Sequence, residues 1–199
     1  MTTDALGRPP APVPDRLRQR LADRAEAAGL VEVAYRTLDS PLGPLLLAAT
    51  PAGLVRVAFA PGGAGPVLAE LAAAVGPRVL RAPARLDPAA RQLGEYFAGA
   101  RRHFDLDLDL RLARGFRLAV LAQLAAIPYG AVRTYAEVAR AAGHPGAARA
   151  VGTACATNPL PLVVPCHRVV RADGTPGGYG GGTAAKAHLL ALEAPSPTA

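Results

Sequence analysis

The fold of the C-terminal half is decided by residues 134–157, TYAEVARAAGHPGAARAVGTACAT. Thr134 and Glu137 have the spacing of a capping box, which opens a helix that we expect to run to about Ala142. The segment GHPG then forms a tight turn, and a second helix follows over residues 147–157. Two short helices joined by a glycine-bearing turn predict a helix-turn-helix motif.

The second of these helices is built almost entirely from small side chains, and its one long side chain is Arg149. A helix that reads base edges in the major groove needs long polar side chains, so this helix is poorly suited to reading sequence. It is suited to sequence-independent binding in the minor groove, with Arg149 as the inserted side chain. The alternative is a buried packing helix, in which Arg149 would need a charged partner.

Basic residues are concentrated in the second half of the 199-residue chain, which has a net charge of +7. Residues 1–110 contain 13 Arg and 12 acidic residues, whereas residues 111–199 contain eight Arg, one Lys and only three acidic residues. An excess of positive charge on one part of a protein is expected of a surface that binds phosphates. The charge distribution therefore favours nucleic acid as a partner of the C-terminal half.

The segment PCHRV at residues 165–169 places a cysteine beside a histidine. A neighbouring imidazole can turn a thiol into an active nucleophile, and the alternative is that Cys166 is buried as a small apolar residue. The glycine-rich segment GGYGGG follows at residues 177–182, where the backbone can approach a ligand closely. A nucleophile that acts on a base of duplex DNA requires that base to be flipped out of the stack, and Arg149 could fill the gap.

The two cysteines, Cys155 and Cys166, are too few for a disulfide scaffold and favour a reducing cytoplasm. A zinc site would have to recruit both of them with His167 and His188, a spacing that matches no common zinc pattern. The sequence has no run of about 18 apolar residues, and its N-terminus does not resemble a secretory signal. We therefore expect a cytoplasmic protein, nucleoid-associated if bacterial, with no metal, no cofactor and no membrane contact.

The N-terminal half is predicted to be a sheet with helices and to carry no evident chemistry. Apolar and alternating runs predict an antiparallel meander of strands over residues 31–37, 45–49 and 54–59. Helices are expected over residues 66–75 and 88–97, where apolar residues recur at helical spacing.

Three further segments have a predicted structure. Residues 104–110 alternate apolar side chains with three aspartates, which predicts a strand with one buried face and one solvated face. Residues 15–28 predict a peripheral amphipathic helix. Its apolar stripe is expected to consist of Leu17, Leu21, Ala25 and Ala28. Thr183 is expected to cap the last helix of the chain.

The chain also carries a set of spaced motifs, namely Ile127-Pro128-Tyr129-Gly130, Thr134-Tyr135, Ala148-Arg149-Ala150-Val151-Gly152, Asn158-Pro159, Pro165-Cys166-His167-Arg168-Val169 and Gly178-Tyr179-Gly180-Gly181. Together they resemble the O6-alkylguanine-DNA alkyltransferases. The resemblance is close over residues 116–193 and weaker over the N-terminal part. The chain departs from the family at Phe116-Arg117 and Val120-Leu121, where Phe-Gln and Val-Trp pairs are common.

The resemblance implies an α+β fold, with a ribonuclease-H-like antiparallel sheet and helices followed by a mostly helical winged helix-turn-helix domain. The implied domains are residues 31–112 and 113–194, after an N-terminal extension over residues 1–30 and before a disordered tail over residues 195–199. The implied activity is a single irreversible transfer of an alkyl group from O6 of guanine to Cys166. The implied partner is double-stranded DNA, bound in the minor groove by a monomer, and the sequence leaves O4-alkylthymine repair open.

The resemblance also implies roles for individual residues. His167 activates the thiol through a water held by Glu193, Asn158 is the hinge that shapes the active-site turn, Tyr135 donates to the leaving guanine, and Lys186 supports the glycine-rich loop. The implied DNA-binding residues are Arg149, Tyr135, Ala147, Ala148, Gly152 and Thr153. The implied pocket for the flipped base consists of Val169, Tyr179, Gly180 and Pro161.

The sequence leaves two alternative classes of function, a lesion-sensing protein and a cysteine hydrolase. A lesion-sensing relative would bind alkylated guanine without transfer, but such proteins lack the nucleophilic cysteine that Cys166 supplies. A cysteine hydrolase using Cys166 and His167 would need an oxyanion hole and would leave the basic helix-turn-helix unexplained. Cys155 is expected to pack in the core, and the alternative is that it is an oxidation partner of Cys166.

Overall fold

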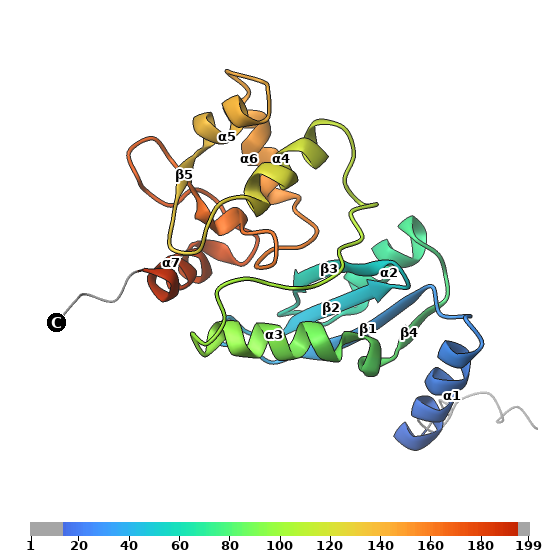
Figure 1. Cartoon of the computed structure of the whole chain (residues 1–199). Coiled ribbons are helices and arrows are strands. Elements are labelled where there is room, and N and C mark those ends of the chain that lie inside the picture. Colours follow the sequence, from blue (N-terminus) through green and yellow to red (C-terminus); the bar gives the residue numbers. More distant parts are fainter. Residues whose placement is uncertain (1–13, 195–199) are drawn as a thin grey trace, which may run out of the picture.

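The computed structural model describes residues 14–194, in which two α+β halves lie against each other (Figure 1). The sequence-based expectations for residues 1–13 and 195–199 lie outside the described residues. The first half consists of α1 (Asp15–Ala27), β1 (Val33–Leu38), β2 (Leu45–Thr50), β3 (Gly53–Phe59), α2 (Gly65–Ala74), β4 (Val79–Arg81), the 3₁₀ turn η1 (Pro83–Leu86) and α3 (Asp87–Phe97). The second half consists of α4 (Phe116–Ala125), β5 (Arg133–Thr134), α5 (Tyr135–Ala141), α6 (Ala148–Ala156), the 3₁₀ turn η2 (Cys166–Arg168), β6 (Val169–Val170) and α7 (Gly182–Glu193).

The predicted antiparallel meander is confirmed. Strand β2 pairs antiparallel with both β1 and β3. Strand β4, which the sequence analysis missed, pairs parallel with β1 and gives the strand order β3-β2-β1-β4. A strand of three residues is too short for alternation to reveal it, so its pairing is decided by the neighbouring strand.

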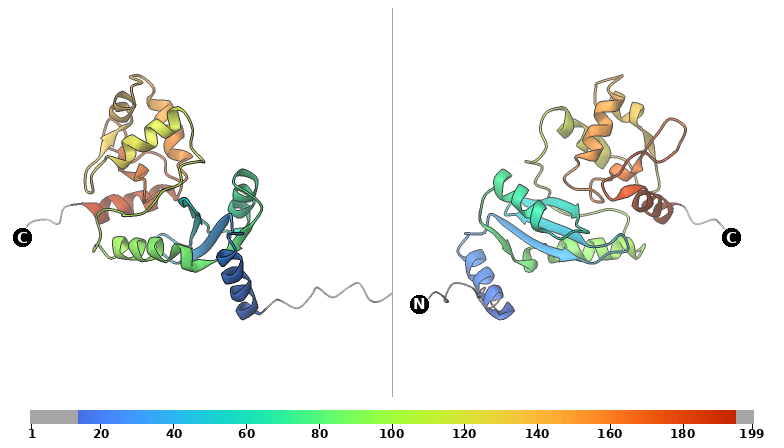
Figure 2. Two further views of the ribbon diagram at one scale, coloured as in Figure 1. Left: turned by 45° about the vertical axis from the view of Figure 1, so that its right-hand side comes forward. Right: turned by 180° about the vertical axis from the view of Figure 1, so that it is seen from behind.

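The sheet is buried on both faces, which explains why residues 45–49 of β2 are all apolar. Successive side chains of a strand point to opposite faces. Leu45 and Leu47 therefore join the core that contains α3 and the second half, whereas Leu46 and Ala48 pack on the face covered by α2. Figure 2 shows α2 and α3 on opposite faces of the sheet.

The strand predicted over residues 104–110 is wrong. The segment makes one isolated parallel bridge, between Leu54 and Leu108, held by two backbone hydrogen bonds of 2.8 Å. It cannot extend along β3 because the next backbone donor of that edge, Val57 N, is bonded to Pro159 O of the second half at 2.8 Å. Asp109 is buried rather than solvated, because the Thr50 hydroxyl and Arg111 donate to its carboxylate.

The predicted helix over residues 15–28 is confirmed as α1, but its predicted apolar stripe is wrong in part. Ala22 and Ala25 are buried, whereas Leu17 and Leu21 are 46% and 60% exposed. Small side chains allow the helix to lie close to β4, and the bulky leucines are left on the outer side. The helix is tied to η1 by an ion pair between Glu26 and Arg85, at 2.5 Å.

The predicted helix-turn-helix is confirmed in α5 and α6. Thr134 accepts a hydrogen bond from the backbone of Glu137, and the Glu137 carboxylate accepts one from the backbone of Thr134, which completes the capping box. Strands β5 and β6 form a short parallel pair beside these helices. The predicted cap at Thr183 is wrong, because α7 begins at Gly182 and Gly181 occupies the N-cap without a side-chain hydrogen bond.

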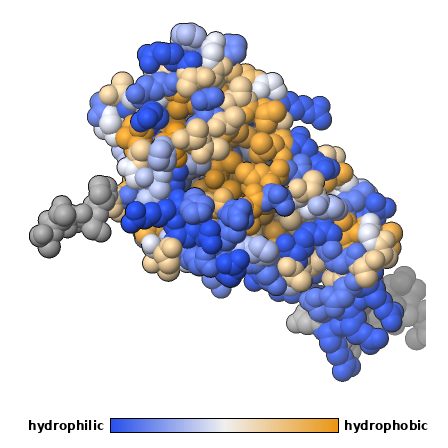
Figure 3. Space-filling model, viewed as in Figure 1, coloured by the Kyte–Doolittle hydropathy of each residue, from blue (hydrophilic) through white to orange (hydrophobic). Residues whose placement is uncertain are grey.

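The two halves share one apolar cluster, which includes Leu47 and Leu93 from the first half and Leu124 and Leu189 from the second. Apolar residues gather at the surface over α4 and over the junction between α4 and the sheet, while the surface over α1 and α3 is mostly polar (Figure 3). No helix within residues 14–194 has the length and apolar character needed to cross a membrane. The shared core holds the C-terminal helices at a defined position on the sheet.

Candidate active site

The turn that delivers Cys166 is held by the side chain of Asn158. Its Nδ2 donates to Val164 O at 2.8 Å, and its Oδ1 accepts from Leu160 N at 3.0 Å. Leu162 lies within the turn at φ 76°, a left-handed conformation that is unusual for a residue other than glycine. The two hydrogen bonds stabilise this strained backbone, so the predicted hinge residue lies where it can shape the turn.

Cys166 is only 3% exposed. Burial raises the pKa of Cys166 to about 11, although Asn158 and the Lys186 ammonium lower it in part. The sequence alone suggested an imidazole-activated thiolate, whereas the buried thiol is protonated at neutral pH. It therefore needs a base during the reaction rather than before it.

The next residue in the chain, His167, has the protonation state that such a base requires. Its Nε2 lies 3.0 Å from Glu193 Oε1, and both side chains are buried. An ionised carboxylate only accepts hydrogen bonds, so Nε2 carries the proton and Nδ1 is the free acceptor. Nδ1 is buried and has no hydrogen-bond partner among the described residues. Burial lowers the pKa of His167, which keeps the imidazole neutral, and Glu193 contacts it directly.

Arg168 is a site residue to which the sequence analysis gave no role. It is buried, and its guanidinium donates from Nε to Glu193 Oε2 at 2.7 Å and from Nη2 to Oε1 at 2.9 Å. Its Nη1 donates to Ile127 O. Burial raises the pKa of Glu193, but hydrogen bonds from His167 and Arg168 outweigh it and lower that pKa to about 2. The only sequence feature that could have indicated a role for Arg168 was its place beside His167 in the PCHRV motif.

Tyr96 is a second residue that the sequence analysis missed. It lies on α3 in the first half of the chain, is fully buried, and donates from its hydroxyl to Glu193 Oε1 at 2.7 Å. Helical spacing is consistent with Tyr96 facing inward from α3. It could not show that the hydroxyl meets Glu193, which lies 97 positions further along the chain.

Lys186 is fully buried on α7, and its ammonium donates to Val169 O. The same ammonium lies 5.9 Å from the centre of the Tyr135 ring. Burial lowers the pKa of Lys186, and the acceptor carbonyl and the ring partly replace the lost water. The lysine therefore supports β6 and Tyr135 rather than bonding the glycine-rich loop itself.

The glycine-rich loop packs tightly against two aromatic rings. A Cβ on Gly177 would overlap the Tyr135 hydroxyl, and a Cβ on Gly181 would lie 2.7 Å from the ring of Phe59. Tyr179 lies edge-on to Phe59 and to His167, with ring centres 5.6 Å and 6.2 Å apart. The loop thus presses Tyr179 toward the site. Among the other predicted pocket residues, Val169 and Pro161 are buried and Gly180 is exposed.

The face of α6 that was predicted to bind DNA is open to solvent. Arg149 and Thr153 are exposed, and Ala147, Ala148 and Gly152 are partly exposed. The opposite face of the helix packs Val151, Ala154 and Cys155 into the core. Within residues 14–194 the Arg149 side chain has no hydrogen bond or ion pair that would account for it as a buried packing residue. Cys155 is a free, buried cysteine, which agrees with the predicted packing role.

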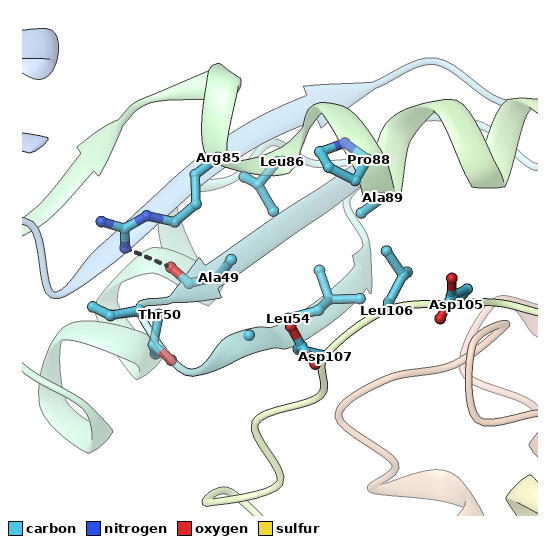
Figure 4. Close-up of a pocket in the computed structure, with 12 residues that line it drawn as sticks. Ala49, Thr50, Leu54, Arg85, Leu86, Pro88, Ala89, Asp105, Leu106 and Asp107 are labelled. Atoms are coloured by element: carbon cyan, nitrogen blue, oxygen red, sulfur yellow. Dashed lines mark hydrogen bonds between the residues drawn. The ribbon is translucent and has the colours of Figure 1, made fainter.

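A cavity of about 290 Å³ lies elsewhere, between β2, β3 and the start of α3 (Figure 4). Its wall includes Arg85, Asp105 and Asp107, and it contains no cysteine or histidine. Arg85 is already paired with Glu26 and bonded to Ala49 O. This cavity therefore includes neither the thiol of Cys166 nor the imidazole of His167.

Two family models match the chain. Residues 33–110 match the model described as 6-O-methylguanine DNA methyltransferase, ribonuclease-like domain, and residues 115–195 match the model of the DNA binding domain of the same protein. The α+β fold expected from the sequence, with a ribonuclease-like first half and a DNA-binding second half, is thereby confirmed.

Individual relatives are similar along most of the chain. The methylated-DNA--protein-cysteine methyltransferase of Mycolicibacterium paratuberculosis is 44% identical over 166 residues, which cover 81% of this chain and 92% of that protein. The crystal structure of Mycobacterium tuberculosis O6-methylguanine methyltransferase is 42% identical, with a TM-score of 0.72, and covers 83% of this chain and 96% of that one. The structure of Mycobacterium tuberculosis OGT in complex with DNA is 41% identical, with a TM-score of 0.70 and coverage of 82% and 96%.

Proposed function

The chain belongs to the 6-O-methylguanine DNA methyltransferase family, and on that basis we propose that it repairs DNA directly, by moving the alkyl group from O6 of guanine to Sγ of Cys166. The observation that carries this assignment is the contact between His167 and Glu193 beside the buried thiol, in a half of the chain that binds DNA. The contact supplies a neutral base whose other ring nitrogen, Nδ1, is buried and has no hydrogen-bond partner among the described residues.

The proposed transfer of the alkyl group to Cys166 requires no cofactor. The bond between the alkyl carbon and O6 breaks while a bond forms between that carbon and Sγ, so guanine leaves with the electron pair of the broken bond. The proton of Cys166 passes to His167, and Tyr135 stabilises the departing purine anion by hydrogen bonding. The anion then takes up a proton in exchange for the one held by His167 and leaves as neutral guanine. The product is a thioether that water does not hydrolyse, so each molecule acts once.

The DNA contacts follow from the open face of α6. Small residues at positions 147, 148 and 152 let the helix backbone approach the floor of the minor groove, and Arg149 enters the stack where the target nucleotide has left it. Binding is independent of sequence because the helix has no long polar side chain to read base edges. One monomer supplies all of these residues.

The test is to incubate the protein with a duplex that carries one O6-methylguanine and to measure intact and peptide masses. We expect one added methyl group per molecule, located on Cys166 and saturating at one equivalent. The Cys155→Ser variant serves as a matched control and should accept the methyl group normally. Tight binding to the lesion without any mass gain would instead identify a lesion sensor and would contradict the proposal.

A further inference from the structure

We propose that Tyr96 is a positioning residue for alkyl transfer, which holds Glu193 Oε1 against His167 Nε2 from the ribonuclease-like half of the chain. This inference rests on the proposed transfer to Cys166. It assigns the first half a direct part in the reaction, in addition to its role as a partner in the shared core.

The geometry of the Tyr96 hydroxyl is specific. It lies 2.7 Å from Glu193 Oε1 and 3.5 Å from His167 Nε2. The shorter contact is an ordinary hydrogen bond and the longer one lies at the limit for such a bond, so the hydroxyl proton is directed to the carboxylate. Burial beside that anion raises the pKa of Tyr96 well above its usual value, which keeps the hydroxyl a donor.

The Tyr96 ring has little freedom to move the hydroxyl elsewhere. It packs against Phe97, Phe104 and Tyr129, with ring centres 5.5 Å, 5.4 Å and 6.3 Å away. These rings come from α3, from the segment that links the halves, and from the second half. The position of the hydroxyl is therefore set by the packing of the two halves against each other, and not by α3 alone.

Glu193 Oε1 is shared by three groups: Tyr96, Arg168 Nη2 and His167 Nε2. Each donor to this oxygen draws charge away from the others. Tyr96 thus limits how strongly the carboxylate stabilises a protonated His167, and it keeps the imidazole a base at neutral pH. Arg168 donates to both oxygens of the carboxylate, whereas Tyr96 donates only to Oε1, the oxygen that contacts His167.

Other ionisable groups also face His167 and define its titration. They are Cys166 and Arg168 from η2, Glu193 and Lys186 from α7, Tyr96 from α3, and Tyr179 from the glycine-rich loop. Among them, Tyr96 is the group contributed by the first half of the chain. A substitution at Tyr96 therefore changes the hydrogen bonds around Glu193 and His167 without altering a residue of the second half.

The experiment compares Tyr96→Phe with Tyr129→Phe. The control removes the hydroxyl of Tyr129 from the same aromatic cluster. That hydroxyl donates to the backbone carbonyl of Leu192 at 3.0 Å and not to the Glu193 carboxylate. The first-order rate of methyl transfer from an O6-methylguanine duplex is measured from pH 5.5 to 9.5, together with DNA affinity and thermal midpoint. Wild-type protein is run in parallel.

For Tyr96→Phe we expect the acid side of the rate–pH profile to move upward by roughly 0.5–1 pH unit, which lowers the rate at neutral pH by up to about threefold. The shift is upward because loss of the Tyr96 donor leaves more negative charge on Glu193 Oε1. That charge stabilises the imidazolium form of His167, so His167 stays protonated up to a higher pH. DNA affinity should be unchanged, and Tyr129→Phe should keep the wild-type profile.

A Tyr96→Phe profile that coincides with wild type, or that falls by one factor at every pH, would overturn the inference while leaving the proposed function intact. If wild-type protein transfers no methyl group, the proposed function fails and this inference fails with it. If Tyr96→Phe does not fold, proton NMR of the wild-type protein decides. The Tyr96 hydroxyl resonance must then shift as His167 titrates, and a constant shift would overturn the inference.

Discussion

The imidazole of His167 and the carboxylate of Glu193 lie 3.0 Å apart, although 26 residues separate them in the chain. One follows the active-site turn and the other ends α7, and both are buried. Because burial raises the pKa of the Cys166 thiol, the proposed alkyl transfer depends on this pair and not on the intrinsic acidity of the cysteine.

The buried thiol should react slowly with a small electrophile at neutral pH. The pKa of Cys166 is raised to about 11 by burial, so its rate of alkylation by iodoacetamide should rise about tenfold per pH unit from pH 7 to 10. The measurement is the initial rate of labelling by mass spectrometry, in a Cys155→Ala background that removes the second thiol. A plateau below about pH 9 would show instead that the resting thiolate is stabilised.

Arg149→Ala should weaken repair of duplex DNA without destabilising the fold. The side chain is exposed, so the thermal midpoint should change by less than about 2 °C. Transfer from a duplex should fall by at least about tenfold, because the gap left by the flipped base is no longer filled. Transfer from the free base should be unaffected. Arg140→Ala removes an exposed cation from α5 and should change both rates much less.

Gly177→Ala should damage the site, whereas Gly178→Ala should be tolerated. A Cβ at Gly177 would overlap the Tyr135 hydroxyl, while a Cβ at Gly178 would meet nothing within 4 Å. We expect the first variant to lose about 1–3 kcal/mol of stability and most of its transfer rate, because the loop or Tyr135 must move. Equal behaviour of the two variants in urea unfolding and in transfer assays would contradict the packing seen here.

Arg168→Met should strongly destabilise the protein. The guanidinium is the charged partner of a buried carboxylate, and removal of one partner of a buried ion pair costs about 3–5 kcal/mol. Urea unfolding at pH 7 measures the loss. Arg91→Ala is the control, since it removes only a surface ion pair with Glu95 and should barely change the urea midpoint. A loss of the same small size at Arg168 would refute its role in neutralising Glu193.

Stability should decline in acid through Glu193. Its pKa in the folded protein is about 2, below the ordinary value of 4.5 that applies to the unfolded chain. A depressed pKa means that the ionised carboxylate stabilises the fold above about pH 4.5 and that this stabilisation is lost as pH falls toward 2. The urea midpoint of wild-type protein should fall more steeply over this window than that of Glu193→Gln, and parallel slopes would exclude the effect.

The amino-acid sequence by itself determined the elements whose signals are local. The capping box at Thr134, the glycine-bearing turn after α5 and the apolar and alternating runs of β1 to β3 predicted the structure found, because each depends on residues a few positions apart. The PCHRV segment indicated a candidate nucleophile and its neighbouring imidazole in the same way, and both are buried in η2.

Tertiary structure alone decided what depends on distant neighbours. Alternation over residues 104–110 could not show that Pro159 occupies the rest of the β3 edge, and helical spacing could not show that Ala22 rather than Leu21 packs inward. The apolar face of α3 likewise could not show that the Tyr96 hydroxyl meets Glu193. Hydrogen bonds and burial depend on which surfaces meet in space, and that meeting sets the charge of Cys166, His167 and Glu193.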